Sequence, residues 1–488
     1  MPQLANRIQA LLERAVHAEQ RCIAVVGAGR SGVAAASALK AAGYNPLVID
    51  ENAANGWSCK RLEQLGVALI DRFDVDLHRN EIIRLAPAAA VLSPGVRGES
   101  HLIKALRALD IAAVSELDLA CALFGAPSIA VSGTNGKSTI LAILKSIYQC
   151  ASREVRISGH GASALEVLAG GTRNEGEDWI IEVSSHQLEE AVDFAPQVAV
   201  MSSLGVDHLE SHGSKDDYHR AKFRLLAAAD TPGSAAIIDT TSTVGAEFAA
   251  KFNGRVVSVQ ANEGPGEATW FDRSTNKLHC RLSTGEFNFS LAQFHLIGAH
   301  NRINAAAAAS AALCLGIAAD AVQGGIEAVE VPPHHLQRLK LPGGRIVIDD
   351  SAAKNPEAAS AALAAVFEVF KLNEVVLLVG GRMKEGNWQE WSELAAQCRG
   401  VICFGESGAE LAKMIKAEQA ALPADIRSAK LVEVASSLSP AVQVAFKESG
   451  ERDLVLFSPG CSSFDEFSGF TERGEAFCSL ARQAAAAD

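Results

Sequence analysis

VSGTNGKSTI, residues 131–140, is a glycine-rich turn that ends in Lys-Ser-Thr and follows the apolar run PSIAV. A turn of this kind, between a buried strand and a helix, holds nucleotide phosphates. The two glycines let backbone N–H groups close around a phosphate, and the lysine can reach the β and γ oxygens. A hydroxyl at the end of the turn can bind Mg²⁺. We therefore predict an ATP site whose phosphate-binding residues are Gly133, Thr134, Asn135, Gly136, Lys137, Ser138 and Thr139.

VVGAGRSG, residues 25–32, is a second glycine-rich turn that follows a strand and opens a helix. With Asp50 at the end of the next strand, it comes close to a dinucleotide fingerprint. Taken alone, this turn leaves an NAD-dependent oxidoreductase open as an alternative. Its glycines show only that a phosphate or close backbone packing is accommodated there.

Short aliphatic runs alternate with helix-forming stretches along the chain, and this rhythm predicts an α/β fold with parallel sheets. The 488 residues are too many for one compact core. We expect three α/β domains at 1–122, 123–330 and 331–488. The last boundary falls in a linker-like stretch that contains Pro332 and Pro333.

Composition excludes several classes of protein. The formal net charge is −13 and no basic tract is present, so we expect no nucleic-acid partner. The ten cysteines form no C-x-x-C pair, which argues against a zinc site or a disulfide framework and favours a reducing compartment. Residues 1–20 read as an amphipathic helix rather than a secretory signal, and no apolar run is long enough to span a bilayer. We therefore expect a cytoplasmic protein that does not associate with membranes.

Three polar side chains beyond the turn could serve a nucleotide and its metal. Glu182 ends the apolar run DWIIE, where a carboxylate would be costly to bury unless it bound a cation. His208 and Lys222 follow in VDHLESHG and YHRAK. From these segments alone, a solvent-facing glutamate, a loop histidine and a surface lysine remain open interpretations.

The order of the motifs is more specific than any one of them. Along the chain they run GTNGKST, EVSSHQLE, DHLESHG, GAHNRIN, PHHLQRL, DDSAAKN, GGRMKEG and SPGCSSFDEFSGF. This series resembles the Mur ligases, the ATP-dependent enzymes that build the peptide stem of peptidoglycan. The C-terminal motif and LSPGV at 92–96 are most similar to those of the member that joins glutamate to UDP-N-acetylmuramoyl-L-alanine.

The resemblance implies an amide ligase that works through an acyl phosphate, with ATP and Mg²⁺, as a monomer. It implies a Rossmann-like N-terminal domain for the UDP-sugar, a central P-loop ATPase-type domain, and a Rossmann-like C-terminal domain for glutamate. The diphosphate at the first glycine turn would then belong to the substrate. The product would feed peptidoglycan synthesis, and through it cell shape and division.

The resemblance also implies residue roles. Lys137, Glu182, His208 and Lys222 are the expected catalytic residues. The expected metal ligands are Ser138, Glu182, His208, and Lys222 if its amine is carbamylated. Around ATP we expect the loop together with Asn301, Asn304, His334 and Asp350. For the UDP-sugar we expect Gly29, Arg30, Ser31, Ser93, Pro94, Gly95 and His160, and for glutamate Lys354, Lys384, Ser463 and Phe470.

Some positions depart from the family pattern: Ala352 stands where a lysine is usual, Lys354 where a threonine, His335 where an arginine, Arg382 where an acidic or small residue, and His160 where an asparagine. A histidine does not reproduce the bidentate contact of an arginine with a phosphate. The added cations make the expected glutamate pocket more positive. D- and L-glutamate carry the same groups, so a variant that adds L-glutamate stays open beside the usual D-glutamate, as does a regulatory protein without turnover.

Overall fold

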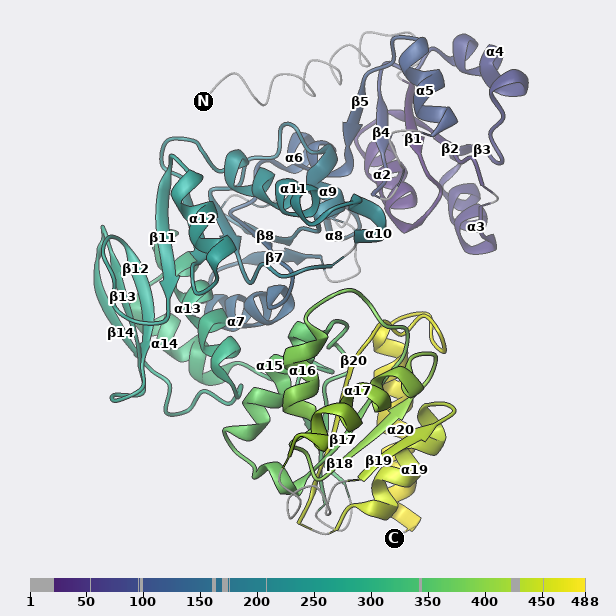
Figure 1. Cartoon of the computed structure of the whole chain (residues 1–488). Helices are drawn as coiled ribbons and strands as arrows, with labels where there is room; N and C mark the ends of the chain where they lie inside the picture. The colour runs from purple at the N-terminus through teal and green to yellow at the C-terminus, as the bar shows by residue number, and fades with distance from the viewer. Residues whose placement is uncertain are drawn as a thin grey trace.

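The structure is a computed structural model that describes residues 22–52, 54–94, 96, 100–159, 164–168, 174, 176–207, 209–341, 345–422, 431–450 and 452–487. Within these ranges the chain forms three sheets, each built from its own stretch of sequence and flanked by helices (Figure 1). The amphipathic helix predicted for residues 1–20 lies outside the described residues. Among the helices of these ranges, none has the length and apolar character that a bilayer span requires.

The first sheet is parallel and has the order β3-β2-β1-β4-β5. Its strands are β1 (Cys22–Val26), β2 (Asn45–Ile49), β3 (Ala68–Ile70), β4 (Ala90–Leu92) and β5 (Ala113–Ser115). The helices of this part are α2 (Arg30–Ala41), α3 (Gly56–Leu65), α4 (Val75–Leu85), α5 (His101–Ala108) and α6 (Glu116–Phe124). The strand order reverses between β1 and β4, so the turns after these two strands meet at the carboxyl edge, where ligands bind in such sheets.

The second sheet has the order β14-β13-β12-β11-β10-β9-β6-β8-β7, and its strands from β7 to β12 pair in parallel. The strands are β6 (Ile129–Ser132), β7 (Val155–Ser158), β8 (Asp178–Glu182), β9 (Val198–Met201), β10 (Ala235–Asp239), β11 (Arg255–Gln260), β12 (Ala268–Asp272), β13 (Lys277–Leu282) and β14 (Gly285–Ser290). The helices are α7 (Lys137–Cys150), α8 (Ala164–Leu168), α9 (Ser185–Glu190), α10 (Leu209–His212), α11 (Lys215–Ala228), α12 (Thr243–Lys251), α13 (Ala299–Cys314) and α14 (Ala319–Ala328). Strand β6, which lies between β9 and β8, is wholly buried, and this fits the uninterrupted apolar run that precedes the phosphate loop.

The third sheet has the order β15-β16-β20-β17-β18-β19, parallel except for β15 at its edge. Its strands are β15 (Gln337–Leu339), β16 (Ile346–Asp349), β17 (Val375–Gly380), β18 (Gly400–Phe404), β19 (Leu431–Ala435) and β20 (Leu454–Gly460). The helical segments are α15 (Pro356–Phe367), η2 (Leu372–Glu374), α16 (Trp388–Ala395), α17 (Gly408–Ala420), α19 (Leu438–Glu448) and α20 (Phe470–Ala487). The carboxyl ends of β16, β20 and β17 therefore lie side by side.

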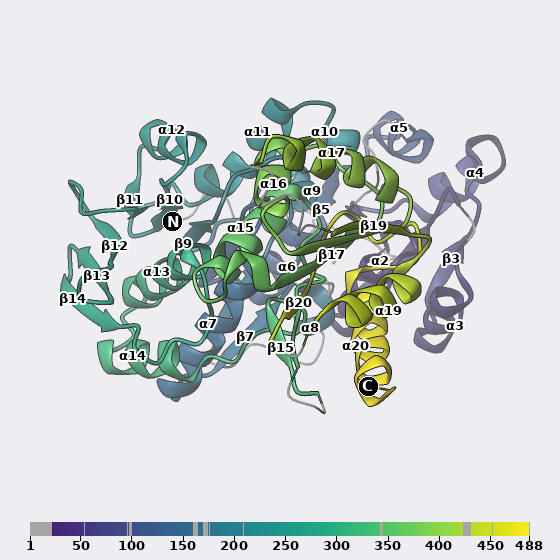
Figure 2. The same cartoon turned by 60° about the horizontal axis from the view of Figure 1, so that its bottom comes forward.

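The second and third parts of the chain meet where α15 lies beside α13 (Figure 2). The contact is close, because a Cβ atom built on Gly298 would lie 2.4 Å from the Cβ atom of Ala365. Arg302 on α13 donates to both carboxylate oxygens of Glu368, at 2.7 and 3.0 Å. The carboxyl ends of the two sheets are thereby brought to face a common space.

The predicted α/β fold with parallel sheets is confirmed. Strands β11 to β14, between Asp239 and the alanine-rich helix, were not predicted from the sequence. β13 buries every second residue, whereas β14 is mostly not buried, so neither strand has the long aliphatic run that marks the parallel strands. Where one domain ends and the next begins stays a prediction.

Candidate functional site

The phosphate loop joins β6 to α7 and depends on its two glycines. Gly133 has φ +142°, and a Cβ atom there would lie 1.9 Å from Ser202 Oγ. Gly136 has φ +90°, and its Cβ atom would lie 2.4 Å from Asn304 Oδ1. Because neither position has room for a side chain, the loop can wrap tightly over the end of the strand. No side chain caps the start of α7, which leaves first-turn N–H groups for an anion.

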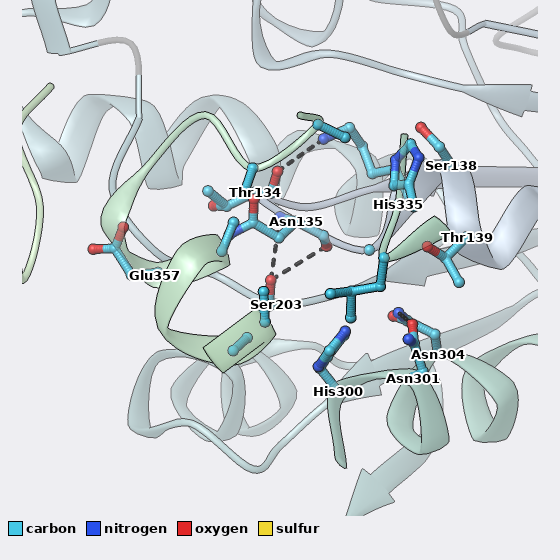
Figure 3. A pocket seen from close by; sticks show the side chains of 18 of the residues that line it. Thr134, Asn135, Ser138, Thr139, Ser203, His300, Asn301, Asn304, His335 and Glu357 are labelled. Carbon is cyan, nitrogen blue, oxygen red and sulfur yellow. Dashed lines mark hydrogen bonds between the residues drawn. The ribbon is translucent and has the colours of Figure 1, made fainter. Parts of the chain in front are cut away.

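Lys137 folds back over this loop. Its Nζ atom donates to Gly133 O at 2.9 Å and to Thr134 O at 3.0 Å. Ser203 braces the other side, since its Oγ atom accepts from Asn135 N and donates to Asn135 O, both at 3.2 Å (Figure 3). The lysine is thus held at the mouth of the loop, within reach of an anion bound there.

Glu182 and Ser138 form an oxygen pair beside the loop. Glu182 ends β8, whose last residue pairs with Val131 of β6, so the carboxylate reaches the loop from the neighbouring strand. Ser138 Oγ donates to Glu182 Oε2 at 3.1 Å. Glu182 is only half-buried and lines the cleft, which is the donor set and exposure that Mg²⁺ prefers.

Lys222 is buried beneath the loop, so the surface-lysine interpretation is wrong. Its side chain is 2% exposed, and Nζ donates to Gly133 O at 2.8 Å. The ammonium group also lies 4.8 Å from the centre of the Tyr218 ring. Burial holds the pKa of Lys222 well below its ordinary value, and the charge of Lys137 lowers it further. His208, predicted to act with this lysine, lies outside the described residues.

Helix α13 forms the opposite wall of the cleft. Asn301 and Asn304 lie together on it, with His300 beside them (Figure 3). Asn304 Nδ2 donates to Asn301 Oδ1 at 3.2 Å, and Asn301 Nδ2 donates to Ile297 O at 2.8 Å. Burial lowers the pKa of His300 to about 4, so the imidazole is neutral near neutral pH. His300 was not predicted from the sequence, because a histidine beside two asparagines has no local signature.

The carboxyl end of β16 supplies Asp350 from the C-terminal part. Its carboxyl group accepts from Ser458 Oγ at 2.8 Å and from Leu336 N at 3.1 Å. Burial is the main cause that raises the pKa of Asp350 to about 8. His334, also predicted near ATP, lies behind the cleft wall and bonds Asp349 Oδ2 through Nδ1 at 2.6 Å, whereas His335 lines the cleft.

These walls enclose a cleft of about 530 Å³, a volume suited to a nucleotide-sized ligand. It collects the loop from Thr134 to Thr139, together with Glu182, from the middle part. From the C-terminal part it collects Asp350, Lys354 and Phe470. Residues of the loop, Asn301, Asn304 and Asp350, predicted from distant stretches of sequence, therefore line one cleft, whereas the predicted His334 does not.

The residues predicted for glutamate divide into two groups. Lys354 and Phe470 line the cleft, with Lys354 Nζ 5.3 Å from the centre of the Phe470 ring. Lys384 Nζ instead bonds Asp207 Oδ1 at 2.8 Å, while Ser463 is buried. Asp207 was not identified from the sequence, although it directly precedes a histidine that was.

Arg382 and Lys384 add less positive charge than the sequence suggested. Arg382 Nε lies 3.0 Å from Glu406 Oε2, in a pair whose arginine side chain is 55% exposed. Lys384 is neutralised by Asp207. Of the cations flagged around the expected glutamate pocket, Lys354 alone has no carboxylate partner within the described residues.

The N-terminal glycine turn meets Ser93 at the reversal of strand order. Ser93 Oγ lies 3.5 Å from Gly27 O, and a Cβ atom on Gly32 would lie 1.8 Å from the same oxygen. A Cβ atom on Gly29 would touch nothing within 4 Å, so this glycine faces open space in which a phosphate fits. Pro94 and Ser31 lie beside the turn, while Gly95 and His160 lie outside the described residues.

Two charged groups bear on what this turn binds. Asp50 accepts from Ala28 N of the turn at 2.5 Å and from Asn52 N, two residues beyond Asp50, at 2.8 Å, so each carboxylate oxygen already accepts from a backbone N–H group. Arg30 reaches Glu166 of the middle part at 3.3 Å. The observed contacts give no specific support to an NAD site.

A phosphate loop on a parallel sheet, a carboxylate on the adjacent strand and a second α/β domain facing both define an ATP-binding enzyme assembled from several domains. The sequence profile of the Mur ligase middle domain matches residues 131–312, and that of the Mur ligase glutamate ligase domain matches residues 336–461. The chain belongs to the Mur ligase family.

Relatives cover nearly the whole chain. A protein of Rubrobacter xylanophilus named UDP-N-acetylmuramoylalanine--D-glutamate ligase is 34% identical, over 94% of this chain and 97% of the relative. The protein of the same name from Geotalea uraniireducens is 30% identical, again over 94% of this chain and 97% of the relative.

Solved structures share the fold at low sequence identity. The UDP-N-acetylmuramate-alanine ligase MurC of Thermotoga maritima has a TM-score of 0.57 at 16% identity, over 95% of this chain and 99% of that one. The MurF ligase of Thermotoga maritima, solved with ADP, has a TM-score of 0.57 at 17% identity, over 91% of this chain and 95% of that one.

Proposed function

We propose that this chain joins D-glutamate to UDP-N-acetylmuramoyl-L-alanine, with conversion of ATP to ADP and phosphate, in the synthesis of peptidoglycan precursors. The observation that carries the proposal is the cleft in which the phosphate loop and Glu182 face Asp350 and Lys354 of the C-terminal domain. The relatives, named D-glutamate ligases over nearly their full length, supply the substrate pair.

ATP is needed because a carboxylate is a poor electrophile. Transfer of the γ-phosphoryl group to the alanyl carboxylate gives an acyl phosphate, in which phosphate has become a good leaving group. The amine of glutamate then attacks the carbonyl carbon, and the tetrahedral intermediate expels phosphate. Positioning and neutralisation of charge account for most of this catalysis, with little covalent chemistry by the protein.

The middle domain would bind the triphosphate. Lys137 would exchange its two loop carbonyls for phosphate oxygens, and the N-terminus of α7 would add its N–H groups. Ser138 and Glu182, with His208, would hold Mg²⁺, which neutralises charge on the phosphate oxygens when it is bound. Asn301 and Asn304 would lie near the adenine, and Asp350 near the ribose, with His334 supporting that wall.

Lys222 would complete the metal site in a carbamylated form. A buried lysine with a lowered pKa holds more neutral amine, the form that adds CO₂ and loses a proton to give a carbamate. The carbamate is an oxygen ligand where an ammonium group would repel a cation. Mass spectrometry should find the mass of one CO₂ added at Lys222, and a rate unaffected by the removal of bicarbonate would contradict this role.

The UDP group and glutamate would bind to the two outer domains. The glycine turn with Gly29, Arg30 and Ser31, together with Ser93, Pro94 and Gly95, would bind the UDP group. His160 of the middle domain would contact the muramoyl group. Lys384, Ser463 and Phe470 would bind glutamate. We place the enzyme in the cytoplasm, where the nucleotide-linked precursor and ATP are available. We expect it to act as a monomer.

Phosphate release from ATP is the test, measured with UDP-N-acetylmuramoyl-L-alanine and either D- or L-glutamate. We expect release that requires the acceptor and D-glutamate together. Release with L-glutamate alone would assign the chain to the variant ligase. Release that ignores both substrates would contradict a ligase and favour a nucleotide-binding regulator.

A further inference from the structure

Lys354 is a cation that faces the phosphate loop without a partner of its own. It makes no hydrogen bond or ion pair with any residue that the structure describes, and its only close contact of this kind is the Phe470 ring at 5.3 Å. Lys384, by contrast, is bonded to Asp207 at 2.8 Å. An unpaired ammonium group on the wall of a cleft is suited to receive an anion.

The residue that follows Lys354 fixes it against the loop. Asn355 and Asn135 exchange two side-chain hydrogen bonds, at 3.3 and 3.1 Å, between the C-terminal and middle domains. Asn355 Oδ1 also accepts from Ala358 N at 2.8 Å and caps α15. On the other side, Ala353 O accepts from Gly460 N at 3.1 Å. The backbone of Lys354 is therefore anchored on both sides, at the start of a helix whose dipole favours anions.

The charges around Lys354 belong to the phosphoryl-transfer end of the cleft. Lys354 shares the cleft wall with Lys137, Ser138 and Glu182, whereas Lys384 does not line it. The Lys354 side chain is accessible to solvent from the cleft. Desolvation by the surrounding protein still lowers its pKa, and Lys137 is the neighbouring charge that lowers it most. Two ammonium groups that face the same space are relieved when an anion lies between them.

Among the described residues of the C-terminal domain that line the cleft, Lys354 is the only lysine or arginine, and Glu357 adds a carboxylate. Ala352 lines the cleft without charge. His335 lines it too, but its Nδ1 atom is held by Pro333 O at 2.7 Å. Lys354 is therefore the group of the C-terminal domain that can balance charge on a phosphate held by the loop.

We propose that Lys354 reaches from the C-terminal domain to the γ-phosphoryl group of ATP and stabilises it during transfer, in place of the cations missing at positions 335 and 352. The inference rests on the proposed function for the transfer step. In that step the bond from the γ-phosphorus to the β–γ bridging oxygen breaks, ADP keeps the electron pair, and a bond forms to the acceptor carboxylate oxygen. Lys354 gives up no proton; its ammonium group neutralises the oxygens of the moving phosphoryl group.

The test compares Lys354→Thr with the double variant Ala352→Lys/Lys354→Thr, which moves the lysine two residues along the same wall. Calorimetry measures the affinities for a non-hydrolysable ATP analogue and for ADP, and the difference between them reports the contribution of the γ-phosphate. We expect Lys354→Thr to weaken binding of the ATP analogue by roughly tenfold to a hundredfold, which is the effect of one charged hydrogen bond. The affinity for ADP should be unchanged. Phosphate release should fall by roughly a hundredfold. The double variant should recover a large part of both losses.

Lys447→Thr is the matched control, because Lys447 lies on α19 of the same domain and is 81% exposed. If Lys354→Thr weakened binding of the ATP analogue and of ADP equally, the proposal would be overturned in favour of a structural role. A raised KM for glutamate with unchanged nucleotide binding would overturn it by assigning Lys354 to the amino acid. Nucleotide binding is measured without acceptor or glutamate, so failure of the ligase assay in the unmodified chain would refute the proposed function and leave this test intact.

Discussion

At the scale of single residues, a side chain at Gly136 of the phosphate loop would have two effects: backbone strain and a steric clash with Asn304. Gly136 and Gly43 have nearly the same positive φ, +90° and +86°. A Cβ atom on Gly136 would collide with Asn304 Oδ1, whereas one on Gly43 would touch nothing within 4 Å. Both alanine variants should lose about 1–2 kcal/mol through backbone strain, but only Gly136→Ala should lose binding of the ATP analogue. Calorimetry and thermal unfolding check this, and equal binding by the two variants would contradict it.

The stability that a single side chain, His334, gives to the fold should depend on pH. The hydrogen bond to Asp349 raises the pKa of His334 above its ordinary 6.5. A raised folded-state pKa means that the pair stabilises the fold fully below pH 6.5 and that this stability is lost as pH rises through the folded-state pKa. The Tm difference between the unmodified chain and His334→Gln should therefore be largest below pH 6.5 and shrink above it. His101→Gln, a substitution of an exposed histidine, is the control. A Tm difference for His334→Gln that stays constant with pH would refute the prediction.

At the scale of elements, Asn355 joins the cap of α15 to the contact between domains. Asn355→Ser keeps an oxygen that can accept from Ala358 N but loses the amide pair with Asn135. Asn355→Ala loses both. We expect the alanine variant to have a free energy of unfolding about 1 kcal/mol lower than that of the serine variant. Both variants should bind the ATP analogue more weakly. Thermal unfolding and calorimetry separate the two effects. If the serine variant binds like the unmodified chain, the amide pair does not position the loop.

The elements also show how far a sequence can be interpreted without a structure. Glu182 lies beside the phosphate loop, because each follows a buried strand and carboxyl ends of adjacent parallel strands share an edge. That Glu182 and Ser138 bind a metal stays a prediction. Asn135 with Asn355 and Asp207 with Lys384 were not predicted, since these pairs lie 220 and 177 residues apart. Pairing over such distances is determined by how domains pack, which no local pattern records.

At the scale of the whole molecule, the cleft depends on contacts that hold the C-terminal domain against the middle domain. Arg302 and Glu368 form one of these contacts, with two charge-assisted bonds at 2.7 and 3.0 Å beside the close approach of Gly298. Arg302→Glu would place two carboxylates together and push the domains apart. We expect small-angle scattering to show a larger radius of gyration, and the KM for ATP to rise about tenfold.

The reversed pair Arg302→Glu/Glu368→Arg is the decisive comparison, because it restores attraction with the charges exchanged. Compactness and the KM for ATP should both return toward those of the unmodified chain. Neither residue lines the cleft, so a loss of ATP use and of compactness that the reversed pair repairs together supports an effect through the position of the domains. If Arg302→Glu leaves scattering unchanged but still impairs ATP use, the contact acts through α13 and its asparagines rather than through closure. High salt should reproduce part of the effect in the unmodified chain, because the glutamate of this pair is partly exposed and salt screens such charges.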